Sequence, residues 1–169
     1  EALRFMVSFA TSLAMVENRI FMGNGNIISL ILQDELLHKG WTAFLINQVV
    51  KEDERFHSIQ EECKDEVYAL YMDVIREEKE WADYLFQKGP VIGLNANILK
   101  DFVDYTALES LKAIGIKYNE PAPRVSPIPW FNKHSDTSKK QTALQENEST
   151  NYVIGVMSES LDYDALPEL

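Results

Sequence analysis

Four stretches of the chain carry hydrophobic residues at helical spacing. Residues 2–22 are apolar nearly all round, which is typical of a helix buried on every side. Further helices are predicted over residues 27–50, 56–86 and 96–114. The helix over 27–50 has an apolar stripe of Ile27, Ile31, Leu45 and Val49. No stretch predicts a strand convincingly, so the fold class is predicted to be all-α, a bundle of long antiparallel helices.

Short polar or flexible segments separate these predicted helices. The sequence GNGN at 23–26 offers a C-cap glycine and an N-cap asparagine, so a helix break is predicted there. Residues 51–55 (KEDER) are predicted to form a charged turn, and residues 87–95 a loop with glycine and proline. Within the third predicted helix, Cys63 is expected to be a small core residue.

The character of the chain changes after residue 116. The proline-rich stretch 117–130 cannot be helical and is expected to wrap the bundle surface in extended form. We divide the chain into helices of the bundle (1–116), a proline-rich surface-wrapping segment (117–134), and a flexible linker with an acidic tail (135–169). The tail from 145 onward has no Lys or Arg but keeps scattered hydrophobic residues, a pattern typical of a segment that becomes ordered on a partner.

Composition excludes several classes of function. A net charge of -11 over 169 residues argues against a nucleic-acid partner. No apolar run is long and uncharged enough to span a bilayer, and no signal peptide is evident. Cys63 is the only cysteine, which rules out an intramolecular disulfide and favours a reducing, cytoplasmic location. Because the sequence starts at Glu1, we expect a fragment or a processed piece.

The stretch ILQDELLHKGW at 31–41 places three polar residues in an otherwise apolar helix. Glu35 and His38 are three residues apart, so one carboxylate and one imidazole share a helix face. This ExxH pair is half of the ligand set of a di-iron or di-manganese carboxylate site. Glu1 opens the neighbouring apolar helix, and Asp34 could orient a histidine ligand through its second ring nitrogen. Taken alone, however, ExxH occurs by chance on many solvated helix faces.

Six sequence blocks in one order resemble a known family. They are EALRFMVSFA, DELLH, EKEWADYLF, IGLN, PIPW and STNYVIG. The chain resembles the C-terminal half of the small, radical-generating β subunit of class Ia ribonucleotide reductase, and we expect a T-even-phage version to be the most similar. The resemblance covers essentially the whole chain. It implies a ferritin-like helical bundle, of which this chain supplies the C-terminal helices, and a tyrosyl radical used for deoxyribonucleotide synthesis.

The resemblance also implies roles for individual residues. Glu1, Glu35 and His38 correspond to metal ligands of a site with two iron ions, where manganese would also suit the ligand types. Asp34 corresponds to an aspartate that hydrogen-bonds toward a histidine ligand and toward a tryptophan on the radical path. Phe5 and Phe9 correspond to an apolar pocket beside the radical, and the same residues also fit an ordinary core.

The tail residues are expected to bind the large (α) subunit of the reductase and to pass the radical to it. Tyr152 corresponds to a tyrosine that relays the radical, although without the family it would be taken as an ordinary anchor aromatic. The residues expected to contact the large subunit are Glu146, Tyr152, Val153, Ile154, Leu166 and Leu169.

The chain departs from the family in what it lacks. A second ExxH pair, a further carboxylate and the radical tyrosine have no counterpart here, so we expect either a partial sequence or a split-gene product. The expected partners are the large subunit, a second small subunit and the N-terminal half of the small subunit. Without that half, the apolar helices should expose large hydrophobic surfaces and associate. Two alternatives are a ferritin-like di-iron oxidase or storage protein, and a non-catalytic fragment that only docks on the large subunit.

Overall fold

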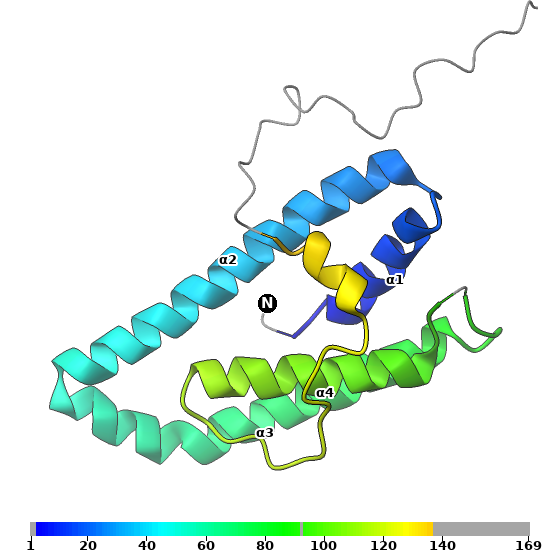
Figure 1. Ribbon diagram of the computed structural model, residues 1–169. Helices are drawn as coiled ribbons and strands as arrows, with labels where there is room; N and C mark the ends of the chain where they lie inside the picture. Colours follow the sequence, from blue (N-terminus) through cyan, green and yellow to red (C-terminus); the bar gives the residue numbers. More distant parts are fainter. Residues whose placement is uncertain (1–2, 92, 137–169) are drawn as a thin grey trace, which may run out of the picture.

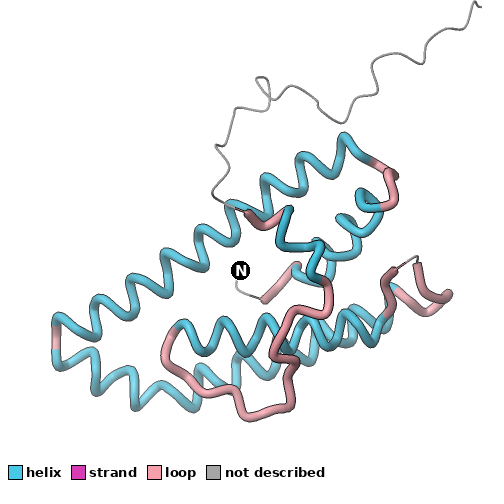
Figure 2. The backbone as a smooth tube through the Cα atoms, viewed as in Figure 1, coloured by secondary structure: helices cyan, strands magenta, loops and turns pink. Residues whose placement is uncertain are grey.

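The computed structural model describes residues 3–91 and 93–136. This part of the chain contains α1 (Met6–Glu17), α2 (Met22–Glu52), α3 (Glu54–Leu85), α4 (Ala96–Ala113) and the 3-10 helix η1 (Pro129–Lys133). In Figures 1 and 2, α2 leads away from α1, α3 turns back beneath it, and α4 runs antiparallel along α3. The same residues form no strand, only one isolated bridge between Val91 and Leu94. The predicted all-α class is confirmed.

Helix α4 forms the centre of the core. Leu99, Val103, Ala107 and Leu111 recur every four residues, so they lie on one face, and each is 0% exposed. The helix begins where the Asn95 side chain accepts a hydrogen bond from the backbone N–H of Ile98 at 3.0 Å. Residues from α1, α3 and the segment after α4 complete the same core.

The break predicted at residues 23–26 is wrong, because α2 already begins at Met22. The chain turns earlier instead, with left-handed conformations at Arg19 (φ 61) and Phe21 (φ 56). Gly25 has a packing role. A Cβ atom built on it would lie 2.2 Å from Cγ2 of Val16, so glycine is what lets α1 approach α2 closely.

Two further local expectations are corrected. The charged turn expected over 51–55 reduces to Asp53, since α2 ends at Glu52 and α3 begins at Glu54. The Asp53 side chain accepts a hydrogen bond from the backbone N–H of Arg55 at 3.0 Å and caps α3. Cys63 is exposed and does not lie in the core; it lines an open pocket that α3 shares with Leu45 and Val49 of α2.

The segment after α4 crosses the core and ends in a short helix. Residues 117–128 have no regular secondary structure, but Pro129–Lys133 form η1, although the proline-rich stretch was expected to be extended to residue 130. Pro129 stands at the start of η1, where a helix tolerates proline because that N–H has no intrahelical acceptor. Phe131 is buried, and its ring meets Phe102 of α4 edge to face with centroids 5.0 Å apart.

One buried polar cluster lies within this packed region. Tyr118 donates a hydrogen bond to Oδ1 of Asp104 at 2.6 Å, and Lys79 pairs with the same oxygen at 2.7 Å. Burial, followed by the hydrogen bond to Asp104, raises the pKa of Tyr118 far above its ordinary value. The phenol therefore stays protonated and acts as a fixed donor.

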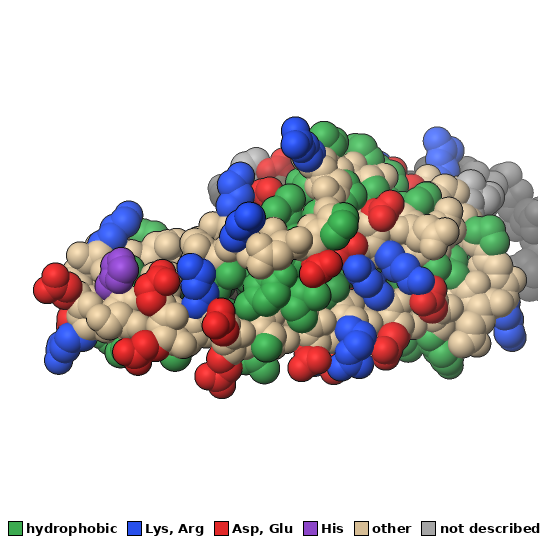
Figure 3. Space-filling model, turned by 90° about the horizontal axis from the view of Figure 1, so that it is seen from below, with side chains coloured by type: hydrophobic (Ala, Val, Ile, Leu, Met, Phe, Trp, Pro, Cys, Tyr) green, Lys and Arg blue, Asp and Glu red, His purple; other side chains and the backbone are tan. Residues whose placement is uncertain are grey.

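The outer surface is mixed in character. Seen from below, acidic and basic side chains surround hydrophobic ones on the same face (Figure 3). On α2, several large apolar side chains are exposed, as expected for a helix without its full set of neighbours: Ile27, Ile31, Leu37, Trp41, Phe44 and Leu45. Among the described residues, no helix is long and apolar enough to cross a membrane.

Candidate functional site

Glu35 and His38 lie on one face of α2, one turn apart. The distance from Oε2 of Glu35 to Nδ1 of His38 is 3.8 Å, close enough for an ion pair but too long for a hydrogen bond. Oε2 of Glu35 is buried and finds no hydrogen-bond partner among the described residues. A buried carboxylate oxygen without a hydrogen bond is costly unless something else satisfies it. The two side chains thus offer an oxygen and a nitrogen donor to the same region of space.

Glu35 also lines a pocket between α1 and α2, of about 380 Å³. On the α2 side, Ile28, Ile31 and Glu35 follow one another at helical spacing. On the α1 side, the lining residues are Phe5, Ser8, Phe9 and Ser12. Phe5 and Phe9, expected to form an apolar pocket beside the radical, therefore line the same pocket as the expected ligand Glu35.

The two phenylalanines occupy different positions in this pocket. Phe9 is buried, whereas Phe5 is 56% exposed and forms an outer part of the wall. Ser8 connects the pocket to α3, because Nε1 of Trp81 donates a hydrogen bond to its Oγ at 2.9 Å. The pocket wall on α1 is thus tied to a second helix.

The remaining predicted site residues are either exposed on α2 or lie outside the described residues. Asp34 is exposed on α2, and His38 is 55% exposed at its side chain. Glu1 lies outside the described residues, as do Glu146, Tyr152, Val153, Ile154, Leu166 and Leu169. In residues 3–91 and 93–136, no group of three His, Cys, Asp or Glu side chains is placed to hold a metal ion. Glu35 and His38 alone would be an incomplete ligand set for a metal ion, although an oxygen and a nitrogen donor suit iron or manganese.

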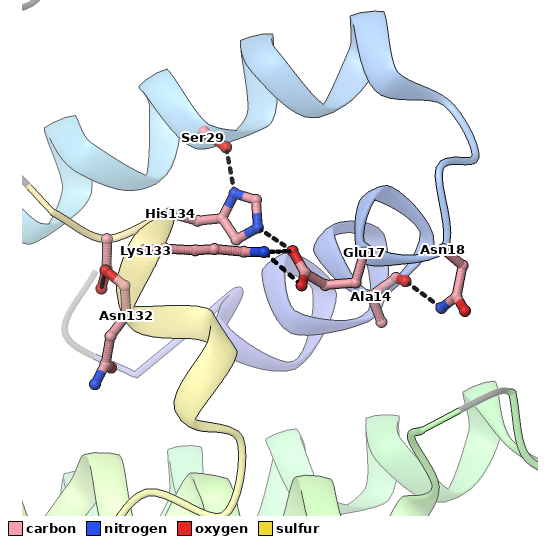
Figure 4. Close-up of polar contacts among 8 residues, drawn as sticks. Ala14, Glu17, Asn18, Ser29, Asn132, Lys133 and His134 are labelled. Carbon is pink, nitrogen blue, oxygen red and sulfur yellow. Dashed lines mark hydrogen bonds and ion pairs between the residues drawn. The ribbon is translucent and has the colours of Figure 1, made fainter. Parts of the chain in front are cut away.

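Sequence reasoning missed a polar cluster that fixes the end of the described chain (Figure 4). Glu17, at the end of α1, accepts hydrogen bonds from Lys133 at 2.5 Å and from Nε2 of His134 at 2.9 Å. The other ring nitrogen of His134 lies 3.2 Å from Oγ of Ser29 on α2. No local signal could have found this cluster, because Glu17 and Ser29 lie more than a hundred residues before Lys133 and His134.

The carboxylate of Glu17 has a lowered pKa. Burial alone would raise the pKa, but the hydrogen bonds and charges of Lys133 and His134 outweigh it. Glu17 therefore stays ionised and holds residues 133 and 134 against α1 and α2.

A second missed carboxylate belongs to Glu78 on α3, which is 8% exposed. Burial raises the pKa of Glu78, while hydrogen bonds from the backbone N–H groups of Val7 and Phe5 oppose the rise. In the sequence it stands in the charged run REEKE, which is indistinguishable from a solvated helix face.

Comparison with known proteins identifies relatives along almost the whole chain. A family model described as the ribonucleotide reductase small chain matches residues 1–123. Ribonucleoside-diphosphate reductase 1 subunit beta of Salmonella typhimurium is 40% identical over 168 residues, which are 98% of this chain and 44% of that protein. The subunit beta of Haemophilus influenzae is 40% identical over 167 residues, covering 96% of this chain and 43% of that protein.

A phage protein is also related. Ribonucleoside-diphosphate reductase subunit beta of Enterobacteria phage T4 is 34% identical over 166 residues, which are 96% of this chain and 43% of that protein. The expectation that a T-even-phage version is the most similar is wrong, because the phage T4 protein is less similar to this chain than the two bacterial proteins are. The chain spans less than half of the length of these relatives.

Proposed function

We propose a function from the premise that the chain belongs to the ribonucleotide reductase small-chain family, whose model matches residues 1–123. The chain is the C-terminal portion of the radical-generating small subunit of a class Ia ribonucleoside-diphosphate reductase. With the large subunit, the complete enzyme reduces ribonucleotides to deoxyribonucleotides. The observation that carries the proposal is the buried Glu35 oxygen without a hydrogen bond, beside His38 and in the pocket of Phe5 and Phe9.

In this proposal Glu35 and His38 hold metal together with Glu1, and Asp34 orients the histidine. The remaining ligands of a two-iron centre, or of a manganese one, come from a part of the subunit that this chain does not contain. When bound, the metal would activate oxygen, the oxidant that generates a stored tyrosyl radical. Phe5, Phe9, Ile28 and Ile31 give the pocket around the Glu35 carboxylate a largely apolar lining.

The exposed face of α2 supports packing against the rest of the subunit. Leu37, Trp41 and Phe44 are 56–61% exposed on one stretch of helix, and such large apolar surfaces mark interaction sites. We assign this face to a part of the small subunit outside this chain, and we expect the complete small subunit to form a homodimer.

The acidic tail is assigned to the large subunit. Tyr152 relays the radical, with Glu146 close to it in sequence, while Val153, Ile154, Leu166 and Leu169 provide apolar contacts. Support for these roles comes from the composition of the tail and from the resemblance to the family, since the tail lies outside the described residues.

The test is turnover by the assembled reductase with Tyr152→Phe. Phenylalanine has no phenolic proton to lose, so turnover should fall to background while bound metal and stored radical remain at wild-type levels. Tyr163→Phe, in the same tail, is the matched control and should keep wild-type turnover. Normal turnover in the Tyr152→Phe variant would remove this residue from the radical path and with it the proposed role of the tail.

A further inference from the structure

The start of α1 has an unusual backbone. Phe5 precedes the first helical residue with φ 72 and ψ -7, a left-handed conformation that residues other than glycine rarely adopt. Its own side chain makes no capping hydrogen bond. Such conformations are strained and persist only where the surrounding structure enforces them.

Glu78 of α3 enforces this one. Its Oε1 accepts a hydrogen bond from the N–H of Phe5 at 3.3 Å, and its Oε2 accepts one from the N–H of Val7 at 3.2 Å. A carboxylate at the N-terminus of a helix is favourable because it satisfies free N–H groups and faces the positive end of the helix dipole. Glu78 thus caps α1 from a helix more than seventy residues away in the sequence.

The turn that Glu78 holds is also the turn that places Phe5 in the pocket wall. Phe5 lines the pocket together with Glu35, and its carbonyl accepts a hydrogen bond from the N–H of Phe9 at 2.7 Å. The backbone of Phe5 is therefore bonded on both sides, to Glu78 through its N–H and to Phe9 through its carbonyl. Its φ angle decides whether the ring faces Glu35.

We propose that Glu78 is a positioning residue for the candidate metal pocket: it fixes the left-handed turn at Phe5 and thereby the outer wall of the pocket around Glu35. The part of the proposal that concerns metal rests on the function proposed above, whereas the part that concerns the Phe5 turn does not.

A helix cap that only stabilises the fold would have a different effect when it is lost than a positioning residue. Its loss would lower the stability of all helices together, and the pocket in the remaining folded molecules would be unchanged. A positioning residue acts locally, so its loss should change Phe5 and the pocket while the core of α4 keeps its protection.

The experiment compares Glu78→Gln with Glu77→Gln in the full chain. Glutamine keeps the shape of Glu78 but brings an NH₂ group against one of the two backbone N–H groups. Glu77 is the matched control, because it is the neighbouring carboxylate on α3 and pairs with Arg4 in a solvent-exposed ion pair at 2.7 Å. Three readouts are taken: amide hydrogen exchange at Phe5, Val7 and Leu111, the 19F spectrum of 4-fluorophenylalanine at position 5, and binding of Mn(II) followed by its electron paramagnetic resonance signal.

For Glu78→Gln we expect exchange at Phe5 and Val7 to accelerate about tenfold or more, with little change at Leu111. The 19F resonance should shift or broaden, and the weak Mn(II) binding through Glu35 and His38 should weaken several-fold. Glu77→Gln should resemble the wild type in all three. Unchanged exchange and 19F signals in Glu78→Gln would overturn the proposal, and so would equal acceleration at all three amides with an unshifted resonance.

The metal readout separates this proposal from the function above. If the wild-type chain binds no Mn(II), the assignment of Glu35 and His38 as ligands loses its support. The exchange and 19F readouts then still decide whether Glu78 holds the Phe5 turn. If Mn(II) binds equally to wild type and Glu78→Gln while the Phe5 signals change, the turn is confirmed, but the claim that it positions the metal pocket is overturned.

Discussion

Helices α4 and α2 are both rich in apolar residues, but they differ in what surrounds them. α4 (Ala96–Ala113) buries a continuous face that includes Leu99, Val103 and Leu111. The longer α2 (Met22–Glu52) buries only Gly25, Leu32 and Gln33 among the residues that the structure describes. An apolar pattern thus indicates which residues favour burial, but they are buried only where another part of the structure packs against them. For α2, the described residues cover only a small part of its apolar side chains.

The largest expected effect is a difference in the free energy of unfolding between a substitution on the buried face of α4 and one on the exposed face of α2. Leu111→Ala removes a side chain that is 0% exposed, so it should lower the free energy of unfolding by about 2–5 kcal/mol. Leu37→Ala removes the same atoms from a position on α2 that is 61% exposed, and it should change stability by less than about 0.5 kcal/mol. Urea denaturation of the isolated chain measures both. Equal losses would mean that α2 has a packed partner within the chain.

A smaller effect is expected for the buried polar cluster of Tyr118, Asp104 and Lys79. Tyr118→Phe removes one hydrogen bond to the buried Asp104 carboxylate, which keeps its ion pair with Lys79. We expect a loss of about 1–2 kcal/mol in the free energy of unfolding, because a buried acceptor loses its donor. Tyr105→Phe on α4 is the control and should be close to neutral. A neutral Tyr118→Phe would show that Lys79 and solvent satisfy Asp104 without the phenol.

The smallest effect concerns the attachment of the end of the described chain to α1 and α2. The folded-state pKa of Glu17 lies below its ordinary value of 4.5. Its contribution to stability is therefore present above about pH 4.5 and is lost as the pH falls through the folded-state pKa. Glu17→Gln should cost about 0.5–1 kcal/mol at pH 7, and this difference should disappear in acid.

Urea denaturation as a function of pH tests this prediction, with Glu62→Gln as the control at an exposed position of α3. A loss for Glu17→Gln that is the same at pH 7 and in acid would contradict the ionic explanation.

The sequence predicted the helices well where local signals and burial agree. The helix predicted over 96–114 is α4, because Asn95 caps it and its apolar face meets α3. The predictions at residues 23–26 and at Cys63 failed because they depend on tertiary contacts. Gly25 is in a helix because Val16 needs the space, and Cys63 is exposed although its spacing matches a core position.

The candidate site could also be predicted only in part. The ExxH spacing and the family resemblance led to Glu35, His38, Phe5 and Phe9, and the structure places three of these four in one pocket. Glu78 and the Glu17 cluster could not be predicted, since each bonds to groups more than seventy residues away. Long-range capping leaves no periodicity or motif in the sequence.

The central claim is that Glu35 and His38 are part of a two-metal centre completed by ligands that this chain does not contain. The most direct measurement is bound iron per chain after anaerobic Fe(II) loading and exposure to oxygen, combined with an electron paramagnetic resonance spectrum. It is made on the chain alone, on the chain mixed with the complementary portion of the subunit, and on the same mixture carrying Glu35→Ala or His38→Ala. The account predicts two irons and a tyrosyl signal only in the wild-type mixture. Two irons bound by the chain alone, or by the mixture with either substitution, would contradict it.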